Sequence, residues 1–209
     1  MIEIREVSVR NGKYTLPTIS MVIPDGCYAV LMGPTGSGKT TLLEAICGLR
    51  AIDHGSVLMG GVDVSHWSPS DRQLGYVPQD LALFPTLSVH QHLAFALRLR
   101  GMTSMAIDAR VEELADLLQI SHLLSRFPKQ LSGGEAQRVA MGRAISFGPR
   151  VLLLDEPLSA LDESTRSQMQ SLLRDVHKAL KMTTLHVTHS ETEAAALADQ
   201  RFVMPSIKS

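Results

Sequence analysis

The order of apolar and polar residues predicts a small antiparallel sheet at the start of the chain. Residues 2–9 alternate between apolar and polar side chains, with a change of phase at Glu6, and this is the period of a strand with one buried face. Residues 19–23 predict a second strand, and residues 57–63 have the pattern of a hairpin with glycines at its turn. We expect these segments to pair as one sheet.

Other apolar segments predict buried strands of a second sheet. Residues 28–32 form a short apolar strand, and residues 151–154 are a continuous apolar run of the kind that is buried in a parallel sheet. Residues 183–188 predict a further strand.

Helical periodicity governs much of the remaining chain. Between residues 106 and 118, apolar side chains recur at i, i+3, i+4 and i+7. Glycines mark the predicted helix ends, among them Gly48, Gly101 and Gly148. Ser190 and Glu193 have the spacing of a capping box that opens the last helix. The predicted helices lie at 41–46, 89–99, 106–118, from the turn at 132–134 to about 147, from about 169 to 180, and after 190.

Alternation of strands and helices around a parallel core predicts an α/β fold. The helices between about residues 80 and 135 form an insertion in this pattern, and the antiparallel strands form a small separate subdomain. A length of 209 residues fits one large domain or two small ones, and because we see no repeat or linker, we expect a single domain over residues 1–209.

Charge and hydropathy narrow the classes of partner. A net charge of −1, from 20 basic and 21 acidic residues, does not provide the basic surface of a nucleic-acid-binding protein, so we expect no nucleic-acid partner. No apolar run approaches the ~18 residues that span a bilayer. Residues 1–6 lack the basic end and apolar stretch of a signal peptide. We therefore expect a soluble, cytosolic chain.

Cysteine and histidine residues do not suggest a metal centre. Cys27 and Cys47 lack a CxxC spacing, and we expect both to be small buried apolar residues. His90 and His92 are two residues apart, which does not place them on one helix face.

The first chemical motif is a glycine-rich loop between a predicted strand and a predicted helix. Glycines allow the backbone to wrap closely around a phosphate, and the following helix presents its positive end. In a P-loop the lysine reaches the β- and γ-phosphates and the hydroxyl after it ligates Mg²⁺. By itself the loop predicts that some nucleoside triphosphate is bound, and the family resemblance described below implies that it is ATP. The predicted binding residues are Gly33, Pro34, Thr35, Gly36, Ser37, Gly38, Lys39, Thr40 and Thr41.

Two adjacent carboxylates end the apolar run at 151–154. Asp155 closes the strand, so we expect it at the carboxyl edge of the sheet, where it can hold Mg²⁺ directly or through water. Glu156 points differently, which suits a group that orients or deprotonates an attacking water. The alternative interpretation of this pair is an acidic helix cap.

A second glycine-rich segment consists of Leu131, Ser132, Gly133, Gly134 and Glu135. A hydroxyl and free N–H groups before a helix can bind an anion, although Ser-Gly-Gly alone is more often a flexible turn. Two distant phosphate cradles in one chain suggest that they serve different molecules or meet across an interface.

With both glycine motifs and the acidic pair in this order, the chain resembles the ATP-binding cassette (ABC) ATPases over residues 2–204. The resemblance implies a P-loop NTPase fold with a helical signature-motif subdomain, and ATP hydrolysis with Mg²⁺. It implies a head-to-tail dimer in which Ser132, Gly133, Gly134 and Glu135 contact the ATP of the other subunit. In that family Asp155 matches the Walker B aspartate and Glu156 the catalytic glutamate.

Three more matches rest on the resemblance. Gln79 matches the Q-loop glutamine that contacts Mg²⁺ and water, so the metal set is Thr40, Gln79 and Asp155. Ser159 and Asp162 match the D-loop, which crosses the dimer interface. His189 matches the switch histidine that touches the γ-phosphate, although a lone histidine after a strand is usually structural. The implied catalytic residues are Glu156, His189 and Gln79.

The sequence departs from the family pattern at a few positions. Ungapped spacing puts Arg10 where an aromatic residue usually stacks on adenine, and Tyr14 follows four residues later, so both stay candidates. Ser190 replaces a common aspartate after the histidine, and both residues cap helices. The chain stops soon after Met204, so we expect it to lack the regulatory domain that many importer ATPases carry.

The resemblance favours an importer, because residues 83–101 are similar to the region of bacterial importer ATPases that docks onto membrane subunits. It implies a homodimer or paired cassette, two transmembrane permease subunits, a solute-binding protein, and a peripheral location on the cytoplasmic face of the inner or plasma membrane. Alternatives are an exporter or lipoprotein-release ATPase, a non-transport ABC ATPase acting on the ribosome or DNA, and a P-loop small-molecule kinase. The transported substrate cannot be predicted from this chain.

Overall fold

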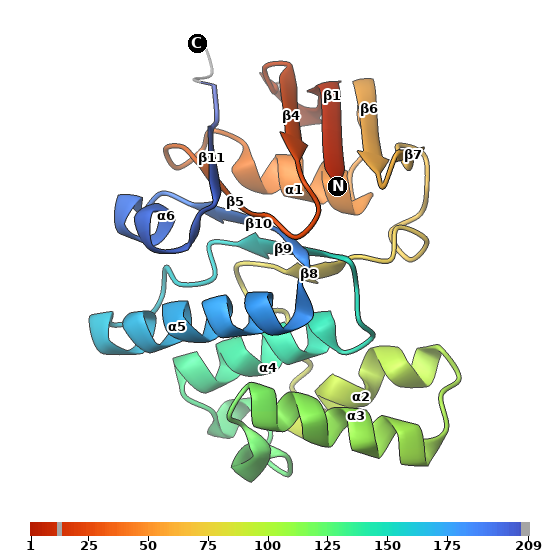
Figure 1. Cartoon of the computed structure of the whole chain (residues 1–209), viewed down its shortest axis with the longest axis vertical. Helices are drawn as coiled ribbons and strands as arrows, with labels where there is room; N and C mark the ends of the chain where they lie inside the picture. The colour runs from red at the N-terminus through yellow and green to blue at the C-terminus, as the bar shows by residue number, and fades with distance from the viewer. Residues whose placement is uncertain (12–13, 206–209) are drawn as a thin grey trace. The chain divides into compact units, whose positions relative to one another are not determined.

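The computed structural model describes residues 1–11 and 14–205, apart from the side chains at positions 11 and 14 (Figure 1). The chain forms two compact units. Unit 1 comprises residues 1–76, 150–156 and 181–209, and unit 2 comprises residues 77–149 and 157–180. The helical insertion that we expected at about 80–135 lies within the first segment of unit 2.

Unit 1 contains a four-stranded antiparallel sheet in the order β4-β1-β6-β7. Its strands are β1 (Ile2–Ser8), β4 (Ile19–Ile23), β6 (His54–Met59) and β7 (Val62–Asp63). The register of β1 shifts between Ile4 and Val7, and Glu6 in this bulge has a φ of 47°. The phase change that the sequence predicts at Glu6 is therefore a β-bulge, which returns Val7 to the buried face. A two-stranded ribbon, β2 (Arg10–Asn11) with β3 (Tyr14–Thr15), follows β1.

The second sheet of unit 1 has the order β11-β5-β10-β9-β8. Strand β10 (Thr183–Thr188) pairs in parallel with both β5 (Tyr28–Met32) and β9 (Val151–Asp155), and every residue of these three strands is buried. Strand β11 (Gln200–Val203) extends the sheet in parallel beside β5. The boundary between the units passes through β8 (Gly75–Val77). The parallel core of the predicted α/β fold is thus confirmed.

Helices α1 (Lys39–Cys47) and α6 (Glu191–Leu197) belong to unit 1, where α1 contacts β9 and α6 contacts β5 (Figure 1). Leu42, Leu43 and Ile46 of α1 are fully buried in a hydrophobic core that also contains the inward residues of both sheets. Burying each such side chain contributes roughly 1.5–3 kcal/mol. This core fixes α1 relative to the strands that carry the polar residues described below.

The far end of α1 is held by Arg72, a residue that the sequence analysis did not single out. Its guanidinium is buried and donates to the carbonyl oxygens of Ala45 and Ile46, both at 2.8 Å, in the last turn of α1. It also donates to the carbonyl oxygens of Ser65 and Trp67. A cation at a helix C-terminus is favourable because the unpaired carbonyl groups there carry partial negative charge.

Unit 2 is helical. It contains α2 (Val89–Leu99), α3 (Ser104–Leu117), α4 (Gly133–Ile145) and α5 (Glu163–Leu180), with two short 3₁₀ helices, η1 (Ser121–Leu123) and η2 (Pro128–Gln130). Helix α2 packs against α3 and α4, and α4 packs against α5 (Figure 1). Within the described residues, no helix is both long and apolar enough to cross a membrane.

Two expectations on single residues need correction. Cys47 is buried, but Cys27, in the turn before β5, is only partly buried because it precedes the covered part of the strand. The capping box at Ser190 is only half formed. Ser190 Oγ accepts from the Glu193 N–H, whereas the Glu193 carboxylate turns inward and accepts from Thr188 Oγ1 at 2.6 Å.

Candidate functional site

The first glycine loop connects β5 to α1, as predicted, and its conformation requires glycine at position 38. Gly38 is the N-cap of α1 with a φ of 89°, and an added Cβ would lie 2.0 Å from Leu16 Cδ2. No side chain among the described residues caps this helix end. The first N–H groups of an uncapped helix carry partial positive charge, so the loop can bind an anion such as a phosphate.

Lys39 follows this glycine and is almost completely buried. Its Nζ donates to the carbonyl oxygens of Gly33 and Pro34 at 2.9 and 3.0 Å, and lies 3.5 Å from Glu156 Oε1. The ammonium group is therefore enclosed by its own loop. Pro34, Thr35 and Gly36 form the exposed part of the loop, whereas Ser37 and Thr41 are buried.

Asp155 ends β9 beside the first turn of α1. Its Oδ1 accepts from Thr40 Oγ1 at 3.2 Å, and its buried Oδ2 has no hydrogen-bond partner among the described residues. Burial raises the pKa of this carboxyl group, and the Thr40 hydrogen bond opposes that change. A carboxylate oxygen without a partner next to a hydroxyl is a donor set that suits Mg²⁺, so these residues fit the metal that the sequence implies.

Glu156 leaves the strand in a left-handed conformation, with a φ of 46°. Its N–H donates to the Val187 carbonyl oxygen at 2.9 Å, which ties this residue to β10. Its carboxylate lies between two cationic or potentially cationic groups, with Oε1 3.5 Å from Lys39 Nζ and Oε2 3.2 Å from His189 Nδ1. The left-handed conformation costs roughly 1–2 kcal/mol for a residue with a Cβ. The carboxylate of Glu156 thus lies beside Lys39 and His189, whereas that of Asp155 contacts Thr40.

His189 follows β10 and is about half exposed, with a side-chain exposure of 54%. Strands β5 and β10 and helix α6 also form a buried polar cluster that the sequence analysis did not predict as a unit. Tyr28 Oη lies 2.9 Å from His186 Nδ1, and His186 Nε2 lies 3.5 Å from Glu193 Oε2. Burial raises the pKa of Tyr28. An ionisable residue such as His186 inside a fully buried strand was the available signal for this cluster.

The remaining predicted residues of the signature and D-loop lie in unit 2. Ser132 caps α4 with a complete capping box, since its Oγ accepts from the Glu135 N–H and its own N–H donates to Glu135 Oε2 at 2.7 Å. The backbone and side chain of Ser132 lower the pKa of Glu135 by hydrogen bonding. An added Cβ on Gly134 would lie 2.6 Å from Thr165 Cγ2, so this glycine permits close packing of α4 against α5.

Asp162 caps α5, because its carboxylate accepts from the Thr165 N–H and from the hydroxyls of Ser164 and Thr165. These hydrogen bonds lower the pKa of Asp162. Ser159 and Gln79 are exposed, as are Ser132 and Gly133.

The two candidates for adenine stacking differ in what the structure describes. Arg10 in β2 is exposed, and its Nε lies 3.9 Å from Asp53 Oδ2. The side chain of Tyr14 lies outside the described residues. Stacking by either residue stays a prediction.

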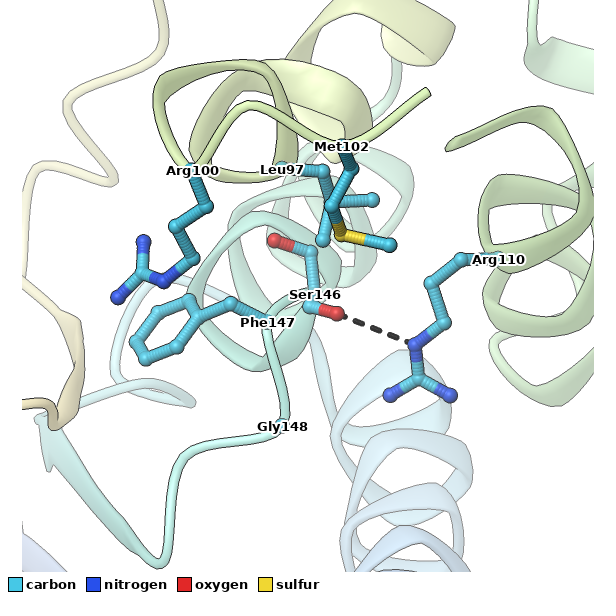
Figure 2. A pocket seen from close by; sticks show the side chains of 7 residues that line it. All are labelled: Leu97, Arg100, Met102, Arg110, Ser146, Phe147 and Gly148. Atoms are coloured by element: carbon cyan, nitrogen blue, oxygen red, sulfur yellow. Dashed lines mark hydrogen bonds between the residues drawn. The ribbon is translucent and has the colours of Figure 1, made fainter. Parts of the chain in front are cut away.

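Unit 2 also contains a cavity of about 300 Å³ that sequence reasoning missed. It is lined by Leu97, Arg100, Met102, Arg110, Ser146, Phe147 and Gly148 (Figure 2). The guanidinium of Arg100 lies 3.9 Å from the centroid of the Phe147 ring, and Arg110 Nε donates to the Ser146 carbonyl oxygen at 3.1 Å. The apolar side chains of Leu97 and Met102 lie between these two cations (Figure 2).

Known proteins resemble this chain over almost its whole length. The molybdate/tungstate import ATP-binding protein WtpC of Pyrococcus abyssi is 43% identical over 204 residues, which are 98% of this chain and 59% of that protein. The sulfate/thiosulfate import ATP-binding protein CysA of Synechococcus elongatus is 44% identical, over 97% of this chain and 59% of that protein. The sn-glycerol-3-phosphate import ATP-binding protein UgpC of Rhodopseudomonas palustris is 46% identical, over 95% of this chain and 57% of that protein.

The chain therefore spans less than 60% of the length of these relatives. A family model described as ABC transporter matches residues 16–159, a range that contains the glycine loop, the signature and both carboxylates. Because this match covers more than half of the sequence, the chain belongs to the ABC transporter family.

Proposed function

We propose that this protein is the ATP-binding and ATP-hydrolysing subunit of an ABC importer. The observation that carries the proposal is the convergence of five side chains around the loop that joins β5 to α1. These side chains are Lys39, Thr40, Asp155, Glu156 and His189, and the contacts among them are 3.5 Å or shorter. Membership of the ABC transporter family supports this function over the small-molecule kinase alternative.

The first part of the site binds the triphosphate. Lys39 and the uncapped start of α1 provide positive charge for the β- and γ-phosphates. Thr40 Oγ1 and the partnerless Oδ2 of Asp155 would hold Mg²⁺, with Gln79 as the third ligand that the family resemblance implies. Bound Mg²⁺ would neutralise the charge that develops on the phosphate oxygens.

The second part of the site acts on the attacking water. The carboxylate of Glu156 lies beside Lys39 and His189, and we assign to it the role of orienting or deprotonating water. His189 would contact the γ-phosphate, which its partial exposure allows.

The signature completes the site in a second copy or a paired cassette. Ser132 and the first N–H groups of α4 form an anion-binding helix start, and the glycines leave it accessible. We assign Ser132, Gly133, Gly134 and Glu135 to the ATP of the partner subunit, and Ser159 with Asp162 to the interface. Binding of ATP closes this dimer, and hydrolysis reopens it, because the nucleotide has a higher affinity for the closed state.

Two transmembrane permease subunits would take up the resulting movement, together with a solute-binding protein, and would hold this chain at the cytoplasmic face of the membrane. Residues 83–101 and the adjoining cavity in Figure 2 are the proposed docking surface. The three relatives are named for different solutes, although their identities to this chain are nearly equal. We therefore assign solute selection to the membrane and solute-binding subunits.

The Glu156→Gln variant tests the catalytic assignment. The amide keeps the shape of the side chain and removes the base, so ATP binding should persist while phosphate release falls by about 10²-fold or more. Both quantities are measured on the purified chain, by fluorescent-nucleotide titration and by a steady-state phosphate assay. Wild-type turnover in this variant would remove Glu156 from its proposed role.

The Lys39→Ala variant tests the phosphate site, since Lys39 is the neighbour of the Glu156 carboxylate. It should weaken ATP binding itself, because it removes the ammonium group of the loop. An unchanged ATP affinity would contradict the assigned phosphate site.

A further inference from the structure

The segment that follows Gln79 has an unusual backbone. Leu81 and Ala82 are consecutive residues with positive φ values, 61° and 43°, and neither is a glycine. Side chains with a Cβ disfavour this conformation, so two in succession persist only where other contacts hold them. The Leu81 N–H donates to the Pro78 carbonyl oxygen at 3.0 Å, which closes a turn that contains Gln79.

Arg143 of α4 holds both of these residues. Its Nη2 donates to the Leu81 carbonyl oxygen at 2.9 Å and its Nη1 donates to the Ala82 carbonyl oxygen. The same guanidinium lies 5.7 Å from the centroid of the Phe84 ring. The planar fork of arginine can bridge two adjacent carbonyl groups in this way, whereas a point charge cannot fix both directions at once.

The other side of the segment is held by α2. The Phe84 N–H donates to His92 Nε2 at 2.9 Å. The His92 and Phe84 rings are stacked, with 6.0 Å between their centroids. The Phe95 ring packs against the Phe84 ring, with 5.2 Å between their centroids. The segment 81–84 is therefore fixed at its carbonyl groups by α4 and at its N–H group and ring by α2.

Helix α4 begins at the signature, with Ser132 as its N-cap, and Arg143 stands in its last turn. A helix of this length transmits a displacement along its axis because its backbone hydrogen bonds are continuous. We infer that Arg143 is a positioning residue that makes segment 81–84 and the signature move as one body. When Ser132 engages ATP, segment 81–84 would therefore be displaced, and its last two residues belong to the proposed docking surface at residues 83–101. This inference rests on the proposed function, since it requires an ATP-dependent dimer and a docking surface.

Hydrogen–deuterium exchange in the Glu156→Gln background tests the inference. In this background ATP with Mg²⁺ should slow exchange at residues 132–136 and alter it at residues 81–84. Adding Arg143→Met should leave the first response in place and abolish the second. The amides at 81–84 should also exchange faster, on the order of tenfold, because two charge-assisted hydrogen bonds are lost.

Arg138→Met is the matched control. Arg138 also lies on α4 and donates to the Leu118 carbonyl oxygen and to Gln119 Oε1, but within the described part of the chain it makes no hydrogen bond with segment 81–84. It should lower the thermal midpoint without removing the response at 81–84. If Arg143→Met does not fold, Arg143→Lys carries the test, with the same direction and a smaller effect.

Loss of the response in Arg138→Met, or its retention in the Arg143 variant, would overturn the inference. If instead the Glu156→Gln parent shows no ATP-dependent response at residues 132–136, the proposed function has failed and not the role of Arg143. Affinity for ATP in the monomer should be the same in all these variants, because none of them alters the loop at residues 33–41.

Discussion

His92 is held as a neutral imidazole, because its Nδ1 faces the Ser88 carbonyl oxygen at 2.8 Å and its Nε2 accepts from the Phe84 N–H. The side chain is completely buried. Burial lowers the pKa of His92, and the nearby charge of Arg143 lowers it further, whereas the hydrogen bond to Ser88 opposes the change. The unfolded chain therefore binds a proton at this position at a higher pH than the folded chain does.

This difference has a defined sign. The stability that neutral His92 contributes is fully present above the ordinary histidine pKa of the unfolded chain. It is lost as the pH falls from that pKa to the lowered pKa of His92 in the folded chain. We expect the free energy of unfolding to fall more steeply in the wild type than in His92→Gln between about pH 7.5 and about pH 5, by at most about 1.4 kcal/mol per pH unit. Denaturant unfolding at several pH values measures both slopes. Parallel slopes would show that His92 does not titrate differently in the two states.

At the same scale, the sequence could indicate residues whose proposed chemistry is tied to a spacing. Lys39, Asp155 and Glu156 could be predicted because each stands at a fixed offset from a glycine loop or an apolar strand. Glu193 could not, since its carboxylate had two available partners, the Ser190 N–H and the Thr188 hydroxyl, and only packing decides between them. Arg143 gave no signal at all, because its partners are backbone carbonyl groups that any sequence would offer.

At the scale of the element, the loop before α1 contains two glycines with positive φ values in different surroundings. Gly36 has a φ of 81°, and no atom of the described residues lies within 4 Å of an added Cβ. Gly38 has a φ of 89°, and an added Cβ there would overlap Leu16. Gly36→Ala should therefore cost only backbone strain, about 1 kcal/mol. Gly38→Ala adds a steric overlap with a buried side chain and should cost about 3 kcal/mol.

Free energies of unfolding from chemical denaturation, measured without nucleotide, separate the two variants. Equal losses would mean that Leu16 gives way and that backbone strain alone requires glycine in this loop. The double change Gly38→Ala, Leu16→Ala is the control, because removal of the Leu16 side chain should recover part of the loss relative to Leu16→Ala alone.

The accuracy of the predicted elements follows their burial. Strands β5, β9 and β10 are buried at every residue and were visible as apolar segments. Helix α5 begins at Glu163, six residues before the first apolar position of its pattern, since most of its first two turns is solvated and carries no periodicity. Strands β8 and β11 were missed because they are short, and β11 alternates only between partly buried and exposed residues.

At the scale of the whole molecule, the proposal of a shared site makes a prediction about assembly. Ser132 should matter to the ATP held by the partner subunit and not to the ATP bound by its own loop. In the Glu156→Gln background, Ser132→Arg should keep nucleotide binding by the monomer and lose ATP-dependent dimerisation. A bulky cation in place of an exposed hydroxyl would clash with the partner's γ-phosphate site. Light scattering with and without ATP measures the mass directly.

Ser121→Arg is a matched change at another exposed serine of unit 2, and it should leave dimerisation intact. If the Ser132 variant dimerises with ATP as well as its Glu156→Gln parent, the two glycine motifs do not share a nucleotide in this protein. The sequence could suggest that assembly only because it contains two phosphate cradles about a hundred residues apart.

The left-handed backbone at Glu156 means that thermal stability and the proposed ATP hydrolysis make opposite demands on one residue. A glycine there would relieve the conformational cost and keep the N–H bond to Val187, so a library sorted for heat resistance alone would favour it if that gain exceeds the loss of the carboxylate contacts with Lys39 and His189. The same library sorted for phosphate release should reject it, since glycine lacks the carboxylate that we propose acts on the attacking water. For a protein engineer, this is the residue to leave untouched while stability is sought elsewhere.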